Sequence, residues 1–176
     1  MSFTLHTKKT APPESRPILE NVEQAFGFIP NMLAVLSESP LALSAYTTVT
    51  GLIEEKARLA PQEQQVVMLT VSQENGCGYC GAAHSKLAEM NKVPADVIKD
   101  IQEGKEPSDA KLAVLSRVTR ELIKKRGWID ENTIDEFLNA GYDKAHLLDV
   151  LTIIALKTIS NYANHIAETP VDPGFK

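Results

Sequence analysis

The sequence is poor in the features that mark secreted, membrane-spanning and nucleic-acid-binding proteins. Its 176 residues include two cysteines, and aromatic residues make up 6% of the chain. The 23 acidic residues outnumber the 18 basic ones, and a net charge of −5 offers no basic surface for a phosphate backbone. The most apolar stretch, residues 150–156, is far shorter than the roughly 20 residues of a membrane helix. We therefore expect neither a nucleic-acid partner nor a membrane partner.

The first twenty residues contain no apolar run of signal-peptide length, which predicts a cytoplasmic protein. A reducing cytosol disfavours structural disulfides. A cysteine pair in such a protein is expected to be catalytic, redox-active or metal-binding.

Alternating strand patterns and solenoid-period repeats are also missing, whereas apolar residues recur every three to four positions from residue 14 onward. This periodicity predicts an all-α fold, with an extended arm over residues 1–13 and a single helical domain over residues 14–176. The helix that begins at Pro61 is apolar on most sides and should be central.

The last helix should begin after Asp143, a residue that can cap it. Its predicted buried face includes four apolar residues: Leu147, Leu151, Ile154 and Ile159. The apolar helix faces are more extensive than one small bundle can cover, which favours a homo-oligomer.

The most informative motif is Cys-x-x-Cys-x-x-x-His, formed by Cys77, Cys80 and His84. On a helix these three side chains fall within an arc of about 60°. Asn75 and Gly76 can end the preceding helix, so Cys77 should lie in the first turn of the next one, where free N–H groups would lower its thiol pKa. His84 is placed to accept the Cys80 proton. The motif therefore predicts redox chemistry at a dithiol.

Two other interpretations of the motif stay open. A zinc site needs four ligands, or three and a water, and His165 is the one distant residue that could join these three. We predict no metal and no organic cofactor. In a purely structural alternative, the cysteines are small buried apolar residues and His84 is a hydrogen-bonded core histidine.

Residues 66–84 closely resemble the core of the AhpD-like alkylhydroperoxidase group within the carboxymuconolactone decarboxylase family. Residues 27–31 and the pair Ser39-Pro40 resemble the N-terminal portion of its peroxidase-related branch. The resemblance implies an all-helical domain that assembles into homo-oligomers, commonly trimers or hexamers. It also implies reduction of alkyl hydroperoxides, with electrons from a dithiol reductant such as a lipoyl protein.

By the same resemblance, Cys80 matches the peroxidatic cysteine, Cys77 the resolving cysteine and His84 the histidine of the proton relay. The chain departs from the family pattern at two positions. Gln65 stands twelve residues before Cys77, where the family has its relay glutamate, and Tyr79 stands between the cysteines, where AhpD has a histidine.

An amide cannot take a proton from a thiol, so Glu63 and Glu74 are the candidate substitutes in the relay. The sequence leaves two alternatives to a thiol peroxidase. One is a carboxymuconolactone-decarboxylase-like enzyme acting on a small lactone or acid, and the other is a non-catalytic thiol redox sensor.

Overall fold

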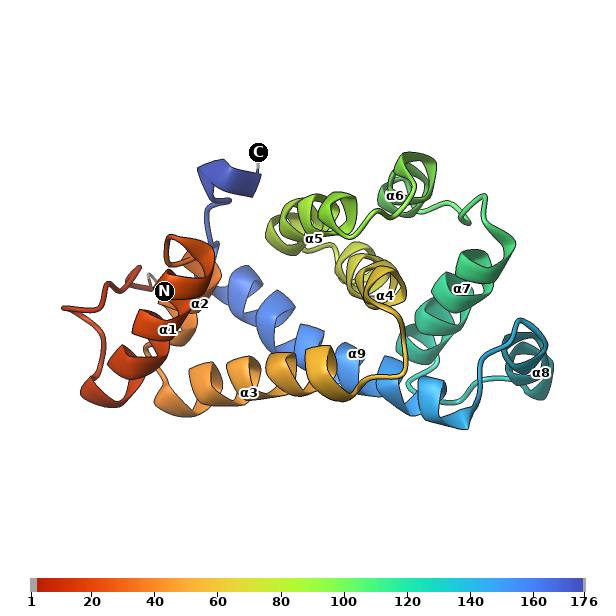
Figure 1. The fold of residues 1–176 in the computed structure, drawn as a ribbon, viewed down its shortest axis with the longest axis horizontal. Helices are drawn as coiled ribbons and strands as arrows, with labels where there is room; N and C mark the ends of the chain where they lie inside the picture. The colour runs from red at the N-terminus through yellow and green to blue at the C-terminus, as the bar shows by residue number, and fades with distance from the viewer. Residues whose placement is uncertain (1–2, 176) are drawn as a thin grey trace.

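The computed structural model describes residues 3–175 and confirms the all-α fold (Figure 1). Those residues contain no strand. Two short 3-10 helices, η1 (Pro13–Ser15) and η2 (Pro173–Phe175), lie near the two ends of the chain. The α-helices are α1 (Arg16–Phe26), α2 (Asn31–Leu36), α3 (Pro40–Lys56), α4 (Pro61–Glu74), α5 (Gly78–Met90), α6 (Ala95–Gln102), α7 (Ala110–Lys124), α8 (Glu131–Asn139) and α9 (Lys144–Ala167).

The helix starts follow local sequence signals. Proline occupies the first position of both α3 and α4, where its missing N–H costs no hydrogen bond. The predicted cap at Asp143 is confirmed, since its Oδ1 accepts hydrogen bonds from the N–H groups of Ala145 (2.9 Å) and His146 (3.0 Å). Each of these bonds satisfies an N–H group that has no partner within the helix.

Helix α4 occupies the centre of the fold, as its apolar sequence predicted (Figure 1). It contacts α5, α6, α7 and α9, and its side chains are buried on nearly every side. Val66, Val67, Leu69 and Val71 are each at most 1% exposed. Because α4 leads directly into the cysteine motif, the central helix holds that motif in place.

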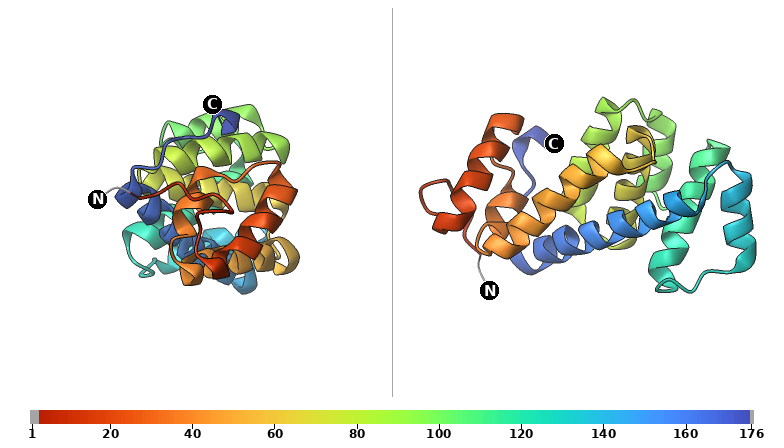
Figure 2. Two further views of the ribbon diagram at one scale, coloured as in Figure 1. Left: turned by 90° about the vertical axis from the view of Figure 1, so that its left-hand side faces the viewer. Right: turned by 60° about the horizontal axis from the view of Figure 1, so that its bottom comes forward.

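Helices α3 and α9 pack against each other along the length of the molecule (Figures 1 and 2). The prediction for the buried face of α9 was correct only in part, because Leu147, Ile154 and Ile159 are half-buried against the core whereas Leu151 is exposed. The face that is buried comprises Val150, Ile153, Leu156, Lys157, Ser160, Asn161 and Asn164. Apolar residues surround this helix on several sides, so periodicity alone could not show that its second half turns polar side chains inward.

The two ends of the described chain lie against the same end of the helical body (Figure 2). Residues 3–12 form no helix, and His6 Nε2 lies 2.7 Å from Glu38 Oε2. The C-terminal segment returns to the start of α2, where Asn31 Nδ2 donates to the Pro170 carbonyl (3.0 Å). Within residues 3–175 no helix is both long and apolar enough to cross a membrane.

Candidate active site

The cysteine motif begins at a sharp turn between α4 and α5. Gly76 adopts φ +64°, a left-handed conformation that L side chains rarely take, and the Cys77 N–H bonds back to the Ser72 carbonyl (2.9 Å). Cys77 is the N-cap residue of α5, and Cys80 lies in the first turn. The predicted break at Asn75 and Gly76 is thus confirmed, with Cys77 at the cap position rather than inside the helix.

Both cysteines are free thiols, and both are buried, at 3% and 2% exposure. Asn164 of α9 places its Nδ2 3.2 Å from Cys80 Sγ and 3.9 Å from Cys77 Sγ. Ser160, one helical turn earlier, has its Oγ 3.9 Å from Cys80 Sγ. Cys80 is therefore surrounded by hydrogen-bonding groups.

The two thiols differ sharply in acidity. The hydrogen bond from Cys77 and the positive charge of Lys157 outweigh burial and lower the pKa of Cys80 to about 5. The same hydrogen bond, together with burial, raises the pKa of Cys77. The expected lowering of the Cys77 pKa was wrong, because at that thiol these two effects outweigh the N-terminal end of the helix. These opposite shifts favour a thiolate at Cys80 and a protonated thiol at Cys77 at neutral pH.

His84 lies one turn beyond Cys80 but does not hydrogen-bond to it. Its Nδ1 lies 3.0 Å from Gln65 Oε1, and its Nε2 lies 2.7 Å from Lys157 Nζ. Burial, and then the charge of Lys157, lower the pKa of His84 well below its usual value, so the ring is neutral. Since an ammonium group only donates, Nε2 accepts from Lys157 and the Nδ1–H group donates to Gln65. The predicted acceptor for the Cys80 proton is thus already occupied.

The two candidate relay glutamates lie in other contacts. Glu63 accepts hydrogen bonds from Ala60 N, Lys111 Nζ and Tyr142 Oη, which fix the start of α4. Glu74 pairs with Arg120 and Lys124 of α7. Of Glu63, Gln65 and Glu74, the structure brings only Gln65 into contact with His84.

A cavity of about 740 Å³ opens onto this cluster. Cys80, His84 and Lys157 line it, whereas Cys77 does not. Apolar side chains from five segments cover much of the remaining wall: Ile18, Val22, Phe26, Leu33, Met68, Leu156 and Phe175. A molecule in the cavity would meet the thiolate sulfur of Cys80 and would be shielded from Cys77.

Part of the chain matches a known family in sequence. Residues 40–114, from the start of α3 into α7, match the carboxymuconolactone decarboxylase family. The matched span includes the whole Cys-x-x-Cys-x-x-x-His motif. No curated protein matches the chain in sequence.

Solved structures share the fold over nearly the whole chain. An uncharacterized peroxidase-related protein from Ralstonia eutropha JMP134, titled as an alkylhydroperoxidase AhpD core, is 16% identical with a TM-score of 0.87, over 98% of this chain and 93% of that one. A peroxidase-related protein from Silicibacter sp. TM1040 is also 16% identical, with a TM-score of 0.84 over 99% and 92%. The debrominase Bmp8 is 18% identical, with a TM-score of 0.76 over 93% and 88%. At these identities the likeness establishes the fold alone.

The sequence did not identify Lys157 as a site residue. It is 1% exposed and bonds to His84, although its position interrupts an apolar run and resembles a solvent-facing break in the helix. The signal that could have revealed it is its spacing of three and seven residues from Ser160 and Asn164 on one helix face. His165 is exposed beside Tyr162, away from the cysteines.

The positions of possible ligand side chains also bear on the alternative interpretation of the motif as a metal site. Within residues 3–175, no group of three or more His, Cys, Asp or Glu side chains is placed to share a metal ion. His84 directs its two ring nitrogens to Gln65 and Lys157.

Tyr79, the residue between the cysteines, fastens the C-terminal segment to the site. Its hydroxyl donates to Asp172 Oδ2 (2.5 Å) and accepts from the Met32 N–H (3.3 Å). The Asp172 carboxylate also accepts from the Asn31 N–H (3.1 Å). The ring packs edge-on against Phe175, which lines the cavity.

We expect Tyr79→Phe to lower the free energy of unfolding by about 1–3 kcal/mol, because a buried hydrogen bond to a carboxylate is lost. Urea unfolding followed by circular dichroism measures this change. The matched control is Tyr162→Phe, an exposed tyrosine of α9, which should change stability by less than about 0.5 kcal/mol. Equal effects of the two substitutions would contradict the anchoring role.

Proposed function

We propose that this protein is a thiol peroxidase that reduces organic hydroperoxides through Cys80 and Cys77. The observation that carries the proposal is the asymmetry of the pair. Cys80 lines the cavity and its pKa is lowered, whereas Cys77 does not line the cavity and its pKa is raised. A thiolate is the nucleophilic form of cysteine, and a neighbouring thiol can close a disulfide.

In the proposed reaction, the Cys80 thiolate attacks the O–O bond of the hydroperoxide. The sulfur gains one oxygen and becomes a sulfenic acid, and the alkoxide leaves as an alcohol after taking up a proton. Cys77 then condenses with the sulfenic acid, forming the disulfide and releasing water. A dithiol reductant, such as a dihydrolipoyl group, restores both thiols and is itself oxidised to a disulfide.

The cavity favours an organic peroxide over hydrogen peroxide as the substrate. Its volume of about 740 Å³ exceeds the space that a molecule of two oxygen atoms requires. Its wall carries apolar side chains from α1, α2, α4 and α9, as well as Phe175. An alkyl or aryl group bound there gains the favourable free energy of apolar burial.

The decisive test is turnover of cumene hydroperoxide with dihydrolipoamide as reductant, compared with hydrogen peroxide. The proposal predicts multiple turnovers per chain and a higher kcat/KM for cumene hydroperoxide. Disulfide formation without turnover would instead favour the redox sensor. Lactone decarboxylation that survives serine at both cysteine positions would favour the decarboxylase-like enzyme.

A parallel assay uses the ligand named for Bmp8, whose C82A variant was crystallised with 2,3,4-tribromopyrrole. Bromide release from that compound with the same reductant, in the absence of peroxide turnover, would indicate that the dithiol catalyses dehalogenation. That result would overturn the proposal.

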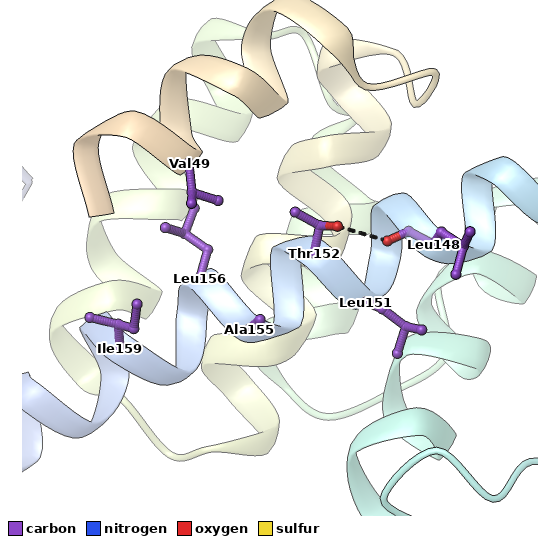
Figure 3. A pocket seen from close by; sticks show the side chains of 7 residues that line it. All are labelled: Val49, Leu148, Leu151, Thr152, Ala155, Leu156 and Ile159. Atoms are coloured by element: carbon purple, nitrogen blue, oxygen red, sulfur yellow. Dashed lines mark hydrogen bonds between the residues drawn. The ribbon is translucent and has the colours of Figure 1, made fainter. Parts of the chain in front are cut away.

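We also propose that the protein is a homo-oligomer, because α3 and α9 leave an apolar face exposed. A shallow groove between them is lined by Val49, Leu148, Leu151, Thr152, Ala155, Leu156 and Ile159 (Figure 3). Leu148 is 62% exposed, and nearby on α3 Leu52 is 49% exposed. A contiguous apolar face of this kind is typical of an interface between protein chains.

The oligomer predicts a large change in size for Leu148→Asp. The wild-type chain should sediment at a multiple of the chain mass, and Leu148→Asp should shift it towards the monomer, because a buried unpaired carboxylate opposes association. Analytical ultracentrifugation measures the shift. Met90→Asp, at an exposed apolar residue at the end of α5, is the control that should stay assembled. A monomeric wild-type protein would rule out the interface.

A further inference from the structure

Lys157 is a buried cation with no carboxylate beside it. Its side chain is 1% exposed, and in the described part of the chain it forms no ion pair with an acidic residue. Its one side-chain hydrogen bond there is the 2.7 Å contact with His84 Nε2. An ammonium group removed from water without a counter-charge is strongly disfavoured. The site must therefore supply a negative charge.

The groups around Lys157 leave one source for that charge. On α3, the pKa of Tyr46 is raised by burial, so its phenol is neutral, and Glu54 is an exposed residue on the wall of the cavity. From α4 the cavity is lined by the uncharged amides of Gln64 and Gln65.

The remaining titratable groups come from α5 and its cap. His84 is neutral, and Cys77 keeps its proton, as described above. Cys80 is the remaining acid, and the Lys157 charge acts on it directly to favour its ionised form.

The geometry of two facing helices explains how the charges meet. On α5, Cys80 and His84 are four residues apart and share a face. On α9, Lys157, Ser160 and Asn164 share the face that contacts them, with Ser160 Oγ 3.9 Å and Asn164 Nδ2 3.2 Å from Cys80 Sγ. The bond to His84 therefore holds the Lys157 ammonium group on the same side of α9 that contacts Cys80 through Ser160 and Asn164.

We propose that Lys157 is a positioning residue that provides the counter-charge of the Cys80 thiolate, and that neutral His84, oriented by Gln65, holds its ammonium group in place. In this arrangement no carboxylate base is needed at position 65, because the thiol is ionised before substrate arrives. Gln65 then serves as the hydrogen-bond acceptor that fixes the His84 tautomer. This role of Lys157 deepens the proposed function, and only its contribution to catalysis rests on that function.

The test measures the ionisation of Cys80 by its rate of reaction with iodoacetamide between pH 4 and pH 10, with the labelled peptide quantified by mass spectrometry. In the wild-type protein, the rate should reach half of its maximum near pH 5. Lys157→Gln retains a donor for His84 but loses the charge. It should raise this midpoint by about one to three pH units.

Two further variants separate charge from packing. Lys157→Arg keeps the positive charge and should keep the midpoint within about half a pH unit of wild type, because the contribution of Lys157 to the midpoint is its charge. Lys144→Gln, at an exposed lysine on the same helix, should leave the midpoint unchanged. A Lys157→Gln midpoint equal to that of wild type would overturn the proposal.

If Lys157→Gln fails to fold, a measurement on the wild-type chain tests whether Lys157 is paired with Cys80. With ¹³C-labelled lysine, the Lys157 side-chain resonance should show an inflection near pH 5 as Cys80 titrates. The inflection should vanish when Cys80 is capped by alkylation with iodoacetamide. A resonance insensitive to the capping would refute the pairing. Neither measurement uses peroxide, so loss of the proposed peroxidase activity would leave this result standing, and the reverse also holds.

Discussion

Cys80→Ser should reduce the single-turnover reaction with cumene hydroperoxide by at least about a thousandfold, because it removes the one sulfur that is both ionised and open to the cavity. A serine hydroxyl at this position has no comparable tendency to ionise and cannot form a sulfenic acid. Stopped-flow loss of peroxide under reducing-agent-free conditions measures the rate. The buried neighbours of Cys80 leave room for an oxygen in place of sulfur, so the fold should be retained.

Cys77→Ser is the matched partner of that variant. It should still consume one peroxide per chain, since Cys80 can attack, but the sulfenic acid then has no thiol with which to condense. Dimedone labelling should trap the sulfenic acid on Cys80, and excess peroxide should carry it on to the sulfinic acid. Equal loss of the first step in both variants would contradict the assignment of roles.

Leu69→Ala should lower the free energy of unfolding by about 2–5 kcal/mol, because it leaves a cavity beside the central helix of the fold. Leu69 is 1% exposed in α4, which contacts four other helices. Thermal and urea unfolding measure the loss. The same helix leads into the turn before Cys77, so the variant should also make both thiols react faster with a bulky reagent such as Ellman's reagent.

The control for that substitution is Leu52→Ala on α3, where the side chain is 49% exposed. In a monomeric reference state, this change should cost less than about 0.5 kcal/mol. Because Leu52 lies near the proposed subunit interface, the comparison is made at a concentration where ultracentrifugation shows one species. Similar losses for both leucines would contradict the central position of α4.

Local signals in the sequence were sufficient to predict most of the helices and several of their ends. Asp143 caps α9, Gly27 and Gly76 follow the ends of α1 and α4, and Pro61 begins α4, all as their chemistry predicts. These features depend on a few neighbouring residues, so they do not require knowledge of the tertiary packing. The same holds for Cys77 and Cys80, whose spacing alone brought them to one end of one helix.

The rest of the site depends on contacts between segments distant in sequence. Lys157 reaches His84, and Asn164 reaches Cys80, from more than seventy residues away, through the packing of α9 against α5. The apolar period of α9 predicted its buried face only in part, because both sides of that helix carry leucine and isoleucine. His84 likewise seemed free to serve as a base until the structure showed Lys157 at its Nε2.

The central claim is that Cys80 and Cys77 together reduce one hydroperoxide. It is tested most directly by titrating the fully reduced protein with cumene hydroperoxide while counting free thiols. Our account predicts the loss of two thiols for each peroxide consumed, and a Cys77–Cys80 disulfide in the digested product. If the peroxide persists and both thiols survive, the thiol peroxidase mechanism is wrong.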